Sequence, residues 1–218
     1  ESLREALPKI LNPRVEAELH AYYGSYFRVY SGITYRTHAV THHANSFLWH
    51  RDMAPMSQAH LMLYLTDSGE VDGATMMLDL HHSMRAASLG YHYEHMESRV
   101  FDIEQVFADV DEEPVVCCPE VKSGDSLMFA AARVLHRGSL PTRGYRDTFT
   151  LVLLPSTVPW QQDIEELGDD HVFEHTSRAT VLTNPFRPLS PLIDEEVGVG
   201  GPKISEQWVL VGALLPSG

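Results

Sequence analysis

The chain has 218 residues, of which 44% are hydrophobic and 21% charged, and its formal net charge is −14 at pH 7. This length and composition are typical of one globular domain of ordinary size. The acidic excess disfavours binding to nucleic acid or to an anionic membrane surface, because like charges repel each other.

The cysteines and the apolar segments bear on the cellular compartment. Cys117 and Cys118 are adjacent, and neighbouring cysteines bridge only with strain, so we expect both to be reduced side chains in a buried strand. No apolar run approaches the roughly 18 to 20 residues that span a bilayer. The first residues lack the basic start and apolar core of a signal peptide. A cytoplasmic location is therefore expected.

The first 44 residues predict two helices followed by extended structure. Pro8 limits the first helix, which opens on a capping-box pattern, to one or two turns. A second helix is expected from Asn12, with Pro13 in the first helical position, to Gly24. Residues 26–44 are rich in β-branched and aromatic side chains and predict one or two strands.

Short strands separated by turn signals dominate the centre of the chain. The segments expected as strands are 59–66, 74–80, 114–121, 126–129, 134–136 and 146–154. With the strands expected earlier in the chain they make roughly eight, interrupted once by a segment with helical spacing. This pattern predicts an all-β core with flanking helices, arranged as a sandwich or jelly roll.

We expect a single domain over residues 1–218, with a core at about 26–155 and a C-terminal extension at about 156–218. The helical insert, at about 83–113, falls where it could cover the mouth of a barrel; a lid, a structural support and a dimer contact all fit its pattern. The extension is acidic and ends in the apolar residues 208–215. These residues are expected to pack onto the body of the protein or onto a second copy in a homodimer.

Three side chains in this series suggest a metal site. His50 and Asp52 form a His-x-Asp pair after an apolar run, and His136 follows several strand signals later. Two histidines and one carboxylate on one side of an ion form the facial triad of non-haem Fe(II) oxygenases. Positions i and i+2 of a strand share a face, so His50 and Asp52 could reach one ion. Arg146 opens a strand ten residues after His136, and Thr148 again lies at i+2.

In this order the motifs resemble the Fe(II)/2-oxoglutarate-dependent dioxygenase superfamily, and within it they most resemble the phytanoyl-CoA dioxygenase-like group. The segments that carry the resemblance are residues 49–52, 72–83, 123–129, 135–139 and 146–148. The resemblance covers residues 45–155. The segment Leu80-His81-His82 departs from the usual proline-glycine form of that group.

The resemblance implies a double-stranded β-helix, a cupin-like jelly-roll barrel with a metal near one open end. It implies that His50, Asp52 and His136 bind Fe(II). It also implies that Arg146, aided by the hydroxyl of Thr148, binds the far carboxylate of the co-substrate 2-oxoglutarate. The implied reaction is oxidation, most simply hydroxylation, of an unactivated C–H bond of a small-molecule substrate by dioxygen, with release of succinate and CO2.

Other interpretations of the same residues stay open. A cupin-type metal-dependent dioxygenase or isomerase would not use 2-oxoglutarate, and a non-enzymatic jelly-roll binding module would keep the triad without activity. Arg146 could be an ion-paired strand residue, with Arg143 as the alternative arginine for the carboxylate. In the insert, Tyr91, Tyr93 and Arg99 are candidates for contact with substrate. The histidines expected to be surface or hydrogen-bonded residues rather than ligands are His42, His43, His81, His82, His92, His95, His171 and His175.

Overall fold

The computed structural model describes residues 3–39, 45–52, 54–142 and 144–168. Arg143, His42, His43 and most of the expected C-terminal extension lie outside the described residues. The chain divides into two compact units. The first unit contains residues 1–33, 54–59 and 151–218, and the second contains residues 34–53 and 60–150.

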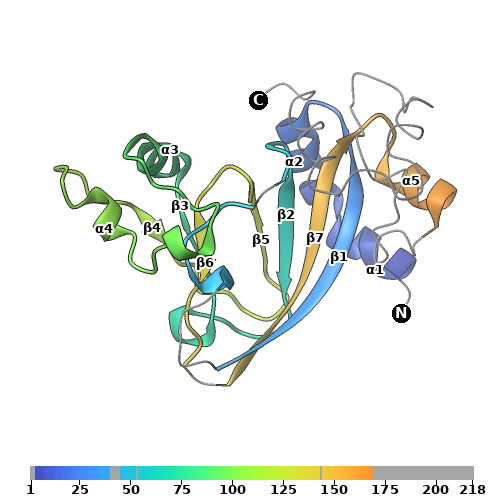
Figure 1. Ribbon diagram of the computed structural model, residues 1–218. Helices are drawn as coiled ribbons and strands as arrows, with labels where there is room; N and C mark the ends of the chain where they lie inside the picture. The colour runs from blue at the N-terminus through green and yellow to red at the C-terminus, as the bar shows by residue number, and fades with distance from the viewer. Residues whose placement is uncertain (1–2, 40–44, 53, 143, 169–218) are drawn as a thin grey trace. The chain divides into compact units, whose positions relative to one another are not determined.

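The strands form two sheets, and every strand pairing resolved in register is antiparallel. One sheet has the order β1-β7-β2-β5, with β1 at Tyr26–His38, β7 at Tyr145–Ser156, β2 at Ala59–Tyr64 and β5 at Ser126–Phe129 (Figure 1). The other has the order β4-β3-β6, with β4 at Val116–Cys117, β3 at Thr75–Leu78 and β6 at His136–Gly138. Antiparallel sheets with flanking helices are therefore confirmed.

Capping residues and proline account for the boundaries of the two N-terminal helices of the first unit. In α2 (Pro13–Tyr23), the Asn12 side chain accepts hydrogen bonds from two backbone N–H groups, and Gly24 ends the helix at φ 63°. Both boundaries confirm the prediction, because a capping side chain and a left-handed glycine are local signals. The first helix, α1 (Leu3–Ile10), is 8 residues or about two turns long, as predicted, and contains Pro8 in its last turn. A proline in this position removes one backbone hydrogen bond of the helix and limits its further extension.

The helices of the first unit are joined by polar contacts as well as by packing. Arg28 of β1 and Asp163 of α5 (Trp160–Leu167) form a buried ion pair with an N···O distance of 3.0 Å. The Trp160 indole donates a 2.6 Å hydrogen bond to Glu16 of α2. These side chains fix α5 against β1 and α2. No helix among the described residues combines the length and the apolar character needed to cross a bilayer.

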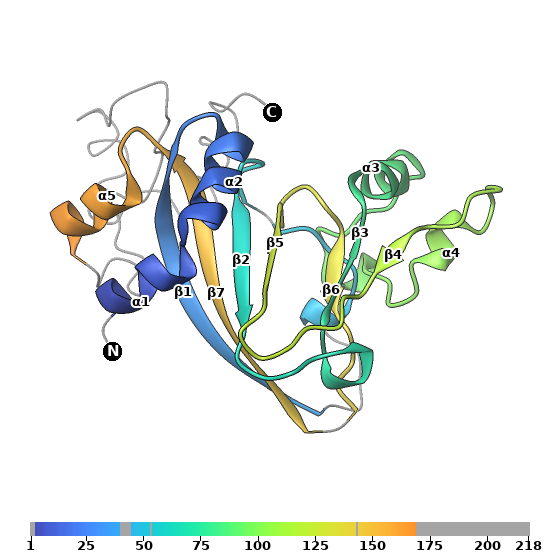
Figure 2. The same ribbon diagram turned by 180° about the vertical axis from the view of Figure 1, so that it is seen from behind.

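The second unit contains the expected helical insert between β3 and β4. It consists of α3 (Leu80–Ser88), the short 3-10 helix η3 (Met96–Ser98) and α4 (Glu104–Phe107). Figure 2 shows α3 and α4 beside the three-stranded sheet from the opposite side. The hydrophobic core of this part of the unit contains Trp49, Leu78, Ala86, Tyr91, Ile103, Phe107 and Leu135. Because Trp49 and Leu135 directly precede His50 and His136, this core supports the segments that carry both histidines.

Tyr91 ties the insert to the segment before His50. Its hydroxyl donates a 2.7 Å hydrogen bond to the carbonyl oxygen of Trp49 and accepts a 3.1 Å bond from Val100 N. Trp49 N in turn donates to Val100 O at 2.9 Å. Tyr91 is 9% exposed, so this candidate for substrate contact is a structural residue. Of the roles considered for the insert, the contacts favour that of a support.

The expectation for the cysteines was wrong in one respect. Cys117 is a free, exposed thiol, and Cys118 is half-buried. The strand β4 lies at the edge of its sheet, where it pairs only with β3. An edge strand leaves one side open to solvent, and the sequence alone could not indicate which strand takes that position.

Candidate metal centre

Backbone hydrogen bonds bring His50 and His136 together. His50 N donates to His136 O at 3.0 Å, and His136 N donates to His50 O at 2.8 Å. The two imidazole rings lie with their centroids 4.5 Å apart. Asp52 N donates to Ala131 O at 3.0 Å, which holds the carboxylate segment beside the histidines. The three predicted ligands therefore meet in one place within the second unit.

Each histidine directs the same ring nitrogen into the site. His50 Nδ1 lies 2.7 Å from Leu48 O, and His136 Nδ1 lies 3.1 Å from Val134 O. A carbonyl oxygen only accepts, so Nδ1 carries the proton and Nε2 of each neutral ring keeps its lone pair. This carbonyl contact at the far nitrogen is typical of metal-binding histidines.

The three ligand atoms have the spacing of a coordination sphere. Asp52 Oδ1 lies 3.8 Å from His50 Nε2 and 3.7 Å from His136 Nε2. Atoms bound at about 2.0 to 2.2 Å to one ion lie roughly 2.8 to 3.6 Å apart, depending on the coordination geometry, so a rotation of the side chains would complete the arrangement. The group of two imidazoles and one carboxylate can hold a metal ion, and this ligand set suits Fe(II).

Burial keeps both histidines neutral and ready to bind a cation. It lowers the pKa of His50 to about 4, with a further decrease from the charge of His136. Burial also lowers the pKa of His136 to about 4. At neutral pH neither ring binds a second proton, so protons do not compete with a metal for the Nε2 atoms.

A third histidine, His60, faces the same carboxylate and was missed in the sequence. His60 Nε2 lies 3.3 Å from Asp52 Oδ2, the oxygen that does not face His50 and His136. Burial lowers the pKa of His60 to about 4. In β2, His60 shares a face with Met62 and Tyr64. A histidine alternating with apolar residues in a buried strand was the available signal, but its partner is not a sequence neighbour.

The arginine predicted to bind the co-substrate, Arg146, is a half-buried residue of β7. Two of the Arg146 nitrogens donate to Gly73 O and to Thr37 Oγ1. Its Nε is buried without a hydrogen-bond partner, as is the hydroxyl of the fully buried Thr148. Burial lowers the pKa of Arg146. Such unpaired buried donors are uncommon and costly unless a ligand satisfies them.

The alternative of an ion-paired Arg146 finds no support among the described residues, since no carboxylate there pairs with it. Asp147, its neighbour on β7, is held instead by Arg36, with N···O distances of 2.6 and 2.8 Å. Arg143, the competing arginine, is not among the described residues.

Of the candidates for substrate contact, Arg99 lies near the triad. Its positive charge contributes to the lowered pKa of both His50 and His136. Arg99 Nε donates a 2.7 Å hydrogen bond to Tyr93 O, and the Tyr93 ring lies under the guanidinium of Arg51 at 4.7 Å. These contacts hold the Arg99 guanidinium and the Tyr93 ring in place within the insert.

Comparison with known proteins gives similarity of structure only. No protein-family model and no curated protein matches the chain. EctD from S. alaskensis with bound Fe matches at 15% identity and a TM-score of 0.50, over 71% of this chain and 53% of that one. SnoK, a non-heme alpha-ketoglutarate-dependent carbocyclase from nogalamycin biosynthesis, matches at 20% identity and a TM-score of 0.49, over 75% and 66%. The iron-bound HygX from Streptomyces hygroscopicus matches at 17% identity and a TM-score of 0.43, over 72% of each chain.

The likeness to EctD shows that this chain shares the fold of an iron-containing protein. The chain spans about two thirds of the length of SnoK and about half of the length of EctD. On that fold the chain carries a His-Asp-His group that can hold a metal.

Proposed function

We propose that the protein is an Fe(II)- and 2-oxoglutarate-dependent oxygenase that hydroxylates an unactivated C–H bond of a small molecule. The proposal includes a double-stranded β-helix as the core. The observation that carries it is the convergence of His50, Asp52 and His136, with both Nε2 atoms directed at one carboxylate oxygen. The fold shared with iron-bound EctD supports it, as does the resemblance of the motifs in the sequence.

The three ligands have distinct roles. His50 and His136 bind through Nε2, because the carbonyls of Leu48 and Val134 hold the opposite nitrogens. Asp52 adds a negative charge that partly neutralises the ion. Three ligands on one side leave positions for a bidentate 2-oxo acid and for dioxygen. When bound, Fe(II) supplies oxidative decarboxylation of 2-oxoglutarate to succinate and CO2, with transfer of one oxygen atom to the substrate.

Arg146 and Thr148 bind the far carboxylate of 2-oxoglutarate in this proposal. Gly73 O and Thr37 Oγ1 orient the guanidinium. Its unpaired Nε and the unpaired Thr148 hydroxyl then supply donors to an anion. The planar guanidinium matches a carboxylate with two parallel hydrogen bonds, and burial strengthens the attraction because water is excluded.

One observation favours a second candidate function, that of a cupin-type enzyme without 2-oxoglutarate. Cupin metal sites commonly have three or four ligands, most of them histidine, and His60 lies only 3.3 Å from the triad carboxylate. His60 would then be a fourth ligand. The buried, unpaired donors on β7 argue against this reading, because a cupin-type reaction gives them no anion to bind.

The experiment that separates these functions is titration of 2-oxoglutarate into the anaerobic Fe(II)-loaded protein. The readout is the metal-to-ligand charge-transfer absorption, followed by succinate formation after oxygen is admitted. We expect one 2-oxoglutarate per iron and iron-dependent succinate. Iron binding without 2-oxoglutarate binding at millimolar concentration would favour the cupin-type enzyme. Failure to bind iron would favour a non-enzymatic binding module.

A further inference from the structure

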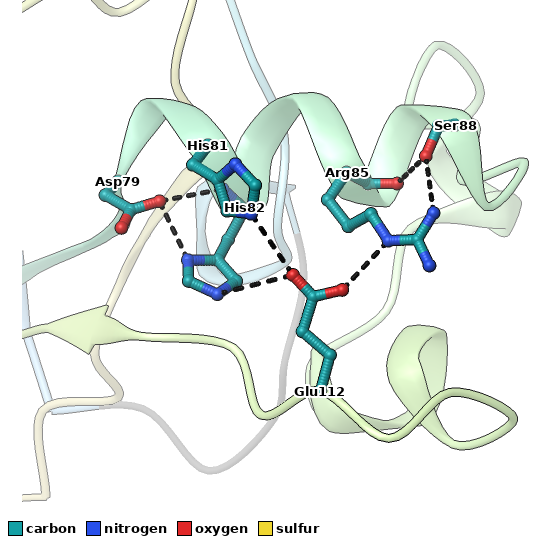
Figure 3. A network of polar contacts seen from close by, with 6 residues as sticks. All are labelled: Asp79, His81, His82, Arg85, Ser88 and Glu112. Carbon is teal, nitrogen blue, oxygen red and sulfur yellow. Dashed lines mark hydrogen bonds and ion pairs between the residues drawn. The ribbon is translucent and has the colours of Figure 1, made fainter.

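A second group of metal-ligand side chains lies in the helical insert, outside the candidate metal centre. His81 and His82 occupy the first turn of α3, and Glu112 lies in the loop before β4 (Figure 3). Glu112 Oε1 lies 3.3 Å from His81 Nε2 and 3.8 Å from His82 Nε2. The sequence analysis treated both histidines as surface or hydrogen-bonded residues, and the proposed oxygenase reaction uses neither of them.

His82 is oriented as a metal ligand would be. Its Nδ1 lies 2.8 Å from Asp79 Oδ1, an oxygen that also accepts a 2.7 Å hydrogen bond from His82 N. The ionised carboxylate accepts, so Nδ1 carries the proton. A neutral His82 therefore presents the lone pair of Nε2 to Glu112, the arrangement that a carboxylate–histidine–metal contact requires.

Glu112 is fixed as an anion facing both rings. Its other oxygen, Oε2, accepts a 2.9 Å hydrogen bond from Arg85 Nε. A lone pair of His82 Nε2 and an anionic oxygen face each other without a proton between them when the ring is neutral. That juxtaposition is repulsive unless a proton or a metal cation lies between the two atoms.

The spacing of the three atoms also fits a divalent metal cation. Ligand atoms at about 2.0 to 2.1 Å from Zn²⁺ lie roughly 3.3 to 3.4 Å apart when the geometry is tetrahedral. The two distances from Glu112 Oε1 lie close to that range, and all three ligand atoms lie within 4.8 Å of one another. The His81 side chain is 74% exposed, which leaves a fourth position open to water. The carboxylates of Asp79 and Glu112 offset the positive charge of Arg85 and of the helix start.

We propose that His81, His82 and Glu112 form a second divalent-cation site, of the kind that binds Zn²⁺. The bound ion cross-links the first turn of α3 to the loop before β4. The site is structural, because the three ligands join two segments of the insert whose core supports His50 and His136. It is independent of the proposed oxygenase activity, because none of its ligands belongs to the His50 group.

The test is calorimetric titration of Zn²⁺ into the full chain carrying Asp52→Ala and His136→Ala, which removes two ligands of the other site. We expect one equivalent of Zn²⁺ in this background and an increase in Tm on its addition, because the ion binds only the folded protein. Adding His81→Ala or Glu112→Gln should weaken Zn²⁺ binding at least tenfold and abolish the increase in Tm. Both altered side chains are at least partly exposed, so the fold should persist, as checked by circular dichroism.

The matched control is His92→Ala, which removes an exposed histidine of the same insert that faces Glu94 at 4.0 Å. Its Zn²⁺ affinity should equal that of the background. A background protein that binds no Zn²⁺ at micromolar concentration, or a His81→Ala variant that binds it equally well, would overturn the proposal and leave an ion-pair network. If the variant with Asp52→Ala and His136→Ala fails to fold, the Zn²⁺ stoichiometry of the protein without these two substitutions is measured instead. We then expect two equivalents of Zn²⁺ in the unaltered protein and one equivalent in His81→Ala. Failure of the oxygenase proposal would appear in a separate measurement, as the absence of 2-oxoglutarate binding to the unaltered Fe(II)-loaded protein.

Discussion

Among the described residues, His50, Asp52 and His136 are the members of this metal-binding group, and His60 contacts the other oxygen of Asp52. We therefore expect His50→Ala, Asp52→Ala and His136→Ala each to abolish turnover. Iron affinity should fall by more than the roughly 10- to 100-fold that loss of a residue supporting a ligand costs. The measurement is iron stoichiometry after anaerobic loading, with His92→Ala as an exposed control. Retention of iron and activity by His136→Ala would show that this residue is not a ligand.

Arg146 decides between an oxygenase that uses 2-oxoglutarate and its cupin-type alternative. Arg146→Ala should weaken the binding of 2-oxoglutarate by about 2 to 5 kcal/mol, or roughly thirtyfold to several-thousandfold in affinity, because it leaves a buried carboxylate unpaired. Arg146→Lys should recover only part of the loss, since an ammonium keeps the charge without the planar fork. Thr148→Val should cost about 1 kcal/mol.

The titration that measures these losses is the anaerobic one with Fe(II)-loaded protein, and iron affinity should stay unchanged throughout. Arg36→Ala is the matched control, because Arg36 is an exposed arginine paired with Asp147 beside Arg146. Unaltered 2-oxoglutarate affinity in Arg146→Ala would remove this arginine from the site and direct attention to Arg143.

Substitution of His60 tests whether this residue orients Asp52 or binds the metal itself. If it only holds Asp52 Oδ2, His60→Ala should lower iron affinity roughly 10- to 100-fold, the range for residues that orient a ligand. Binding of 2-oxoglutarate per bound iron should persist. The same anaerobic iron titration tests this. A loss as complete as that of His136→Ala would make His60 a fourth ligand and favour the cupin-type site.

At the scale of elements, the insert should stabilise the segment that carries His50. Tyr91→Phe removes the hydroxyl that bonds Trp49 O and Val100 N. These buried groups then lose a partner, and the free energy of unfolding should fall by about 1 to 3 kcal/mol. Urea denaturation measures the change. Tyr22→Phe, at a tyrosine that is 40% exposed, should change it by less than about 0.5 kcal/mol. Equal free energies of unfolding for the two variants would show that the hydrogen bonds of the Tyr91 hydroxyl do not stabilise the fold.

At the scale of the whole molecule, the buried His50 and His136 and the half-buried His60 should make the metal-free protein sensitive to acid. The pKa values of His50, His60 and His136 lie at about 4 in the folded protein, below the value of about 6.5 for an unfolded histidine. The unfolded state thus binds more protons between these values, and stability rises with pH there. Their contribution is fully present above about pH 6.5 and is lost as the pH falls toward 4.

Denaturation of metal-free protein at a series of pH values checks this expectation. The free energy of unfolding should decline between pH 6.5 and 4.5, and His136→Asn should make that decline shallower because one titrating group is gone. A flat profile over this interval in the unaltered protein would contradict the neutral state of the three rings.

The sequence by itself determined the features that depend on neighbours along the chain. Asn12 and Gly24 bound α2 through hydrogen bonds and dihedral angles that involve only adjacent residues. Most strands appear where alternation and turn residues predicted them, although β4 is reduced to two residues. Arg146 and Thr148 share a face of β7 through the two-residue period of a strand. His50 and Asp52 were expected to do the same, but His50 lies in an isolated β-bridge and Asp52 in irregular chain, so long-range backbone hydrogen bonds bring them together.

Only the tertiary structure decided which distant residues face each other. It placed His60 against Asp52, set Cys117 on an open edge, committed the Tyr91 hydroxyl to Trp49 and directed His81, His82 and Glu112 toward one point. None of these contacts has a local signal, because each depends on how strands pair and how the insert packs. Local chemistry sets where an element begins and ends, whereas burial and long-range hydrogen bonds select the partner of each side chain.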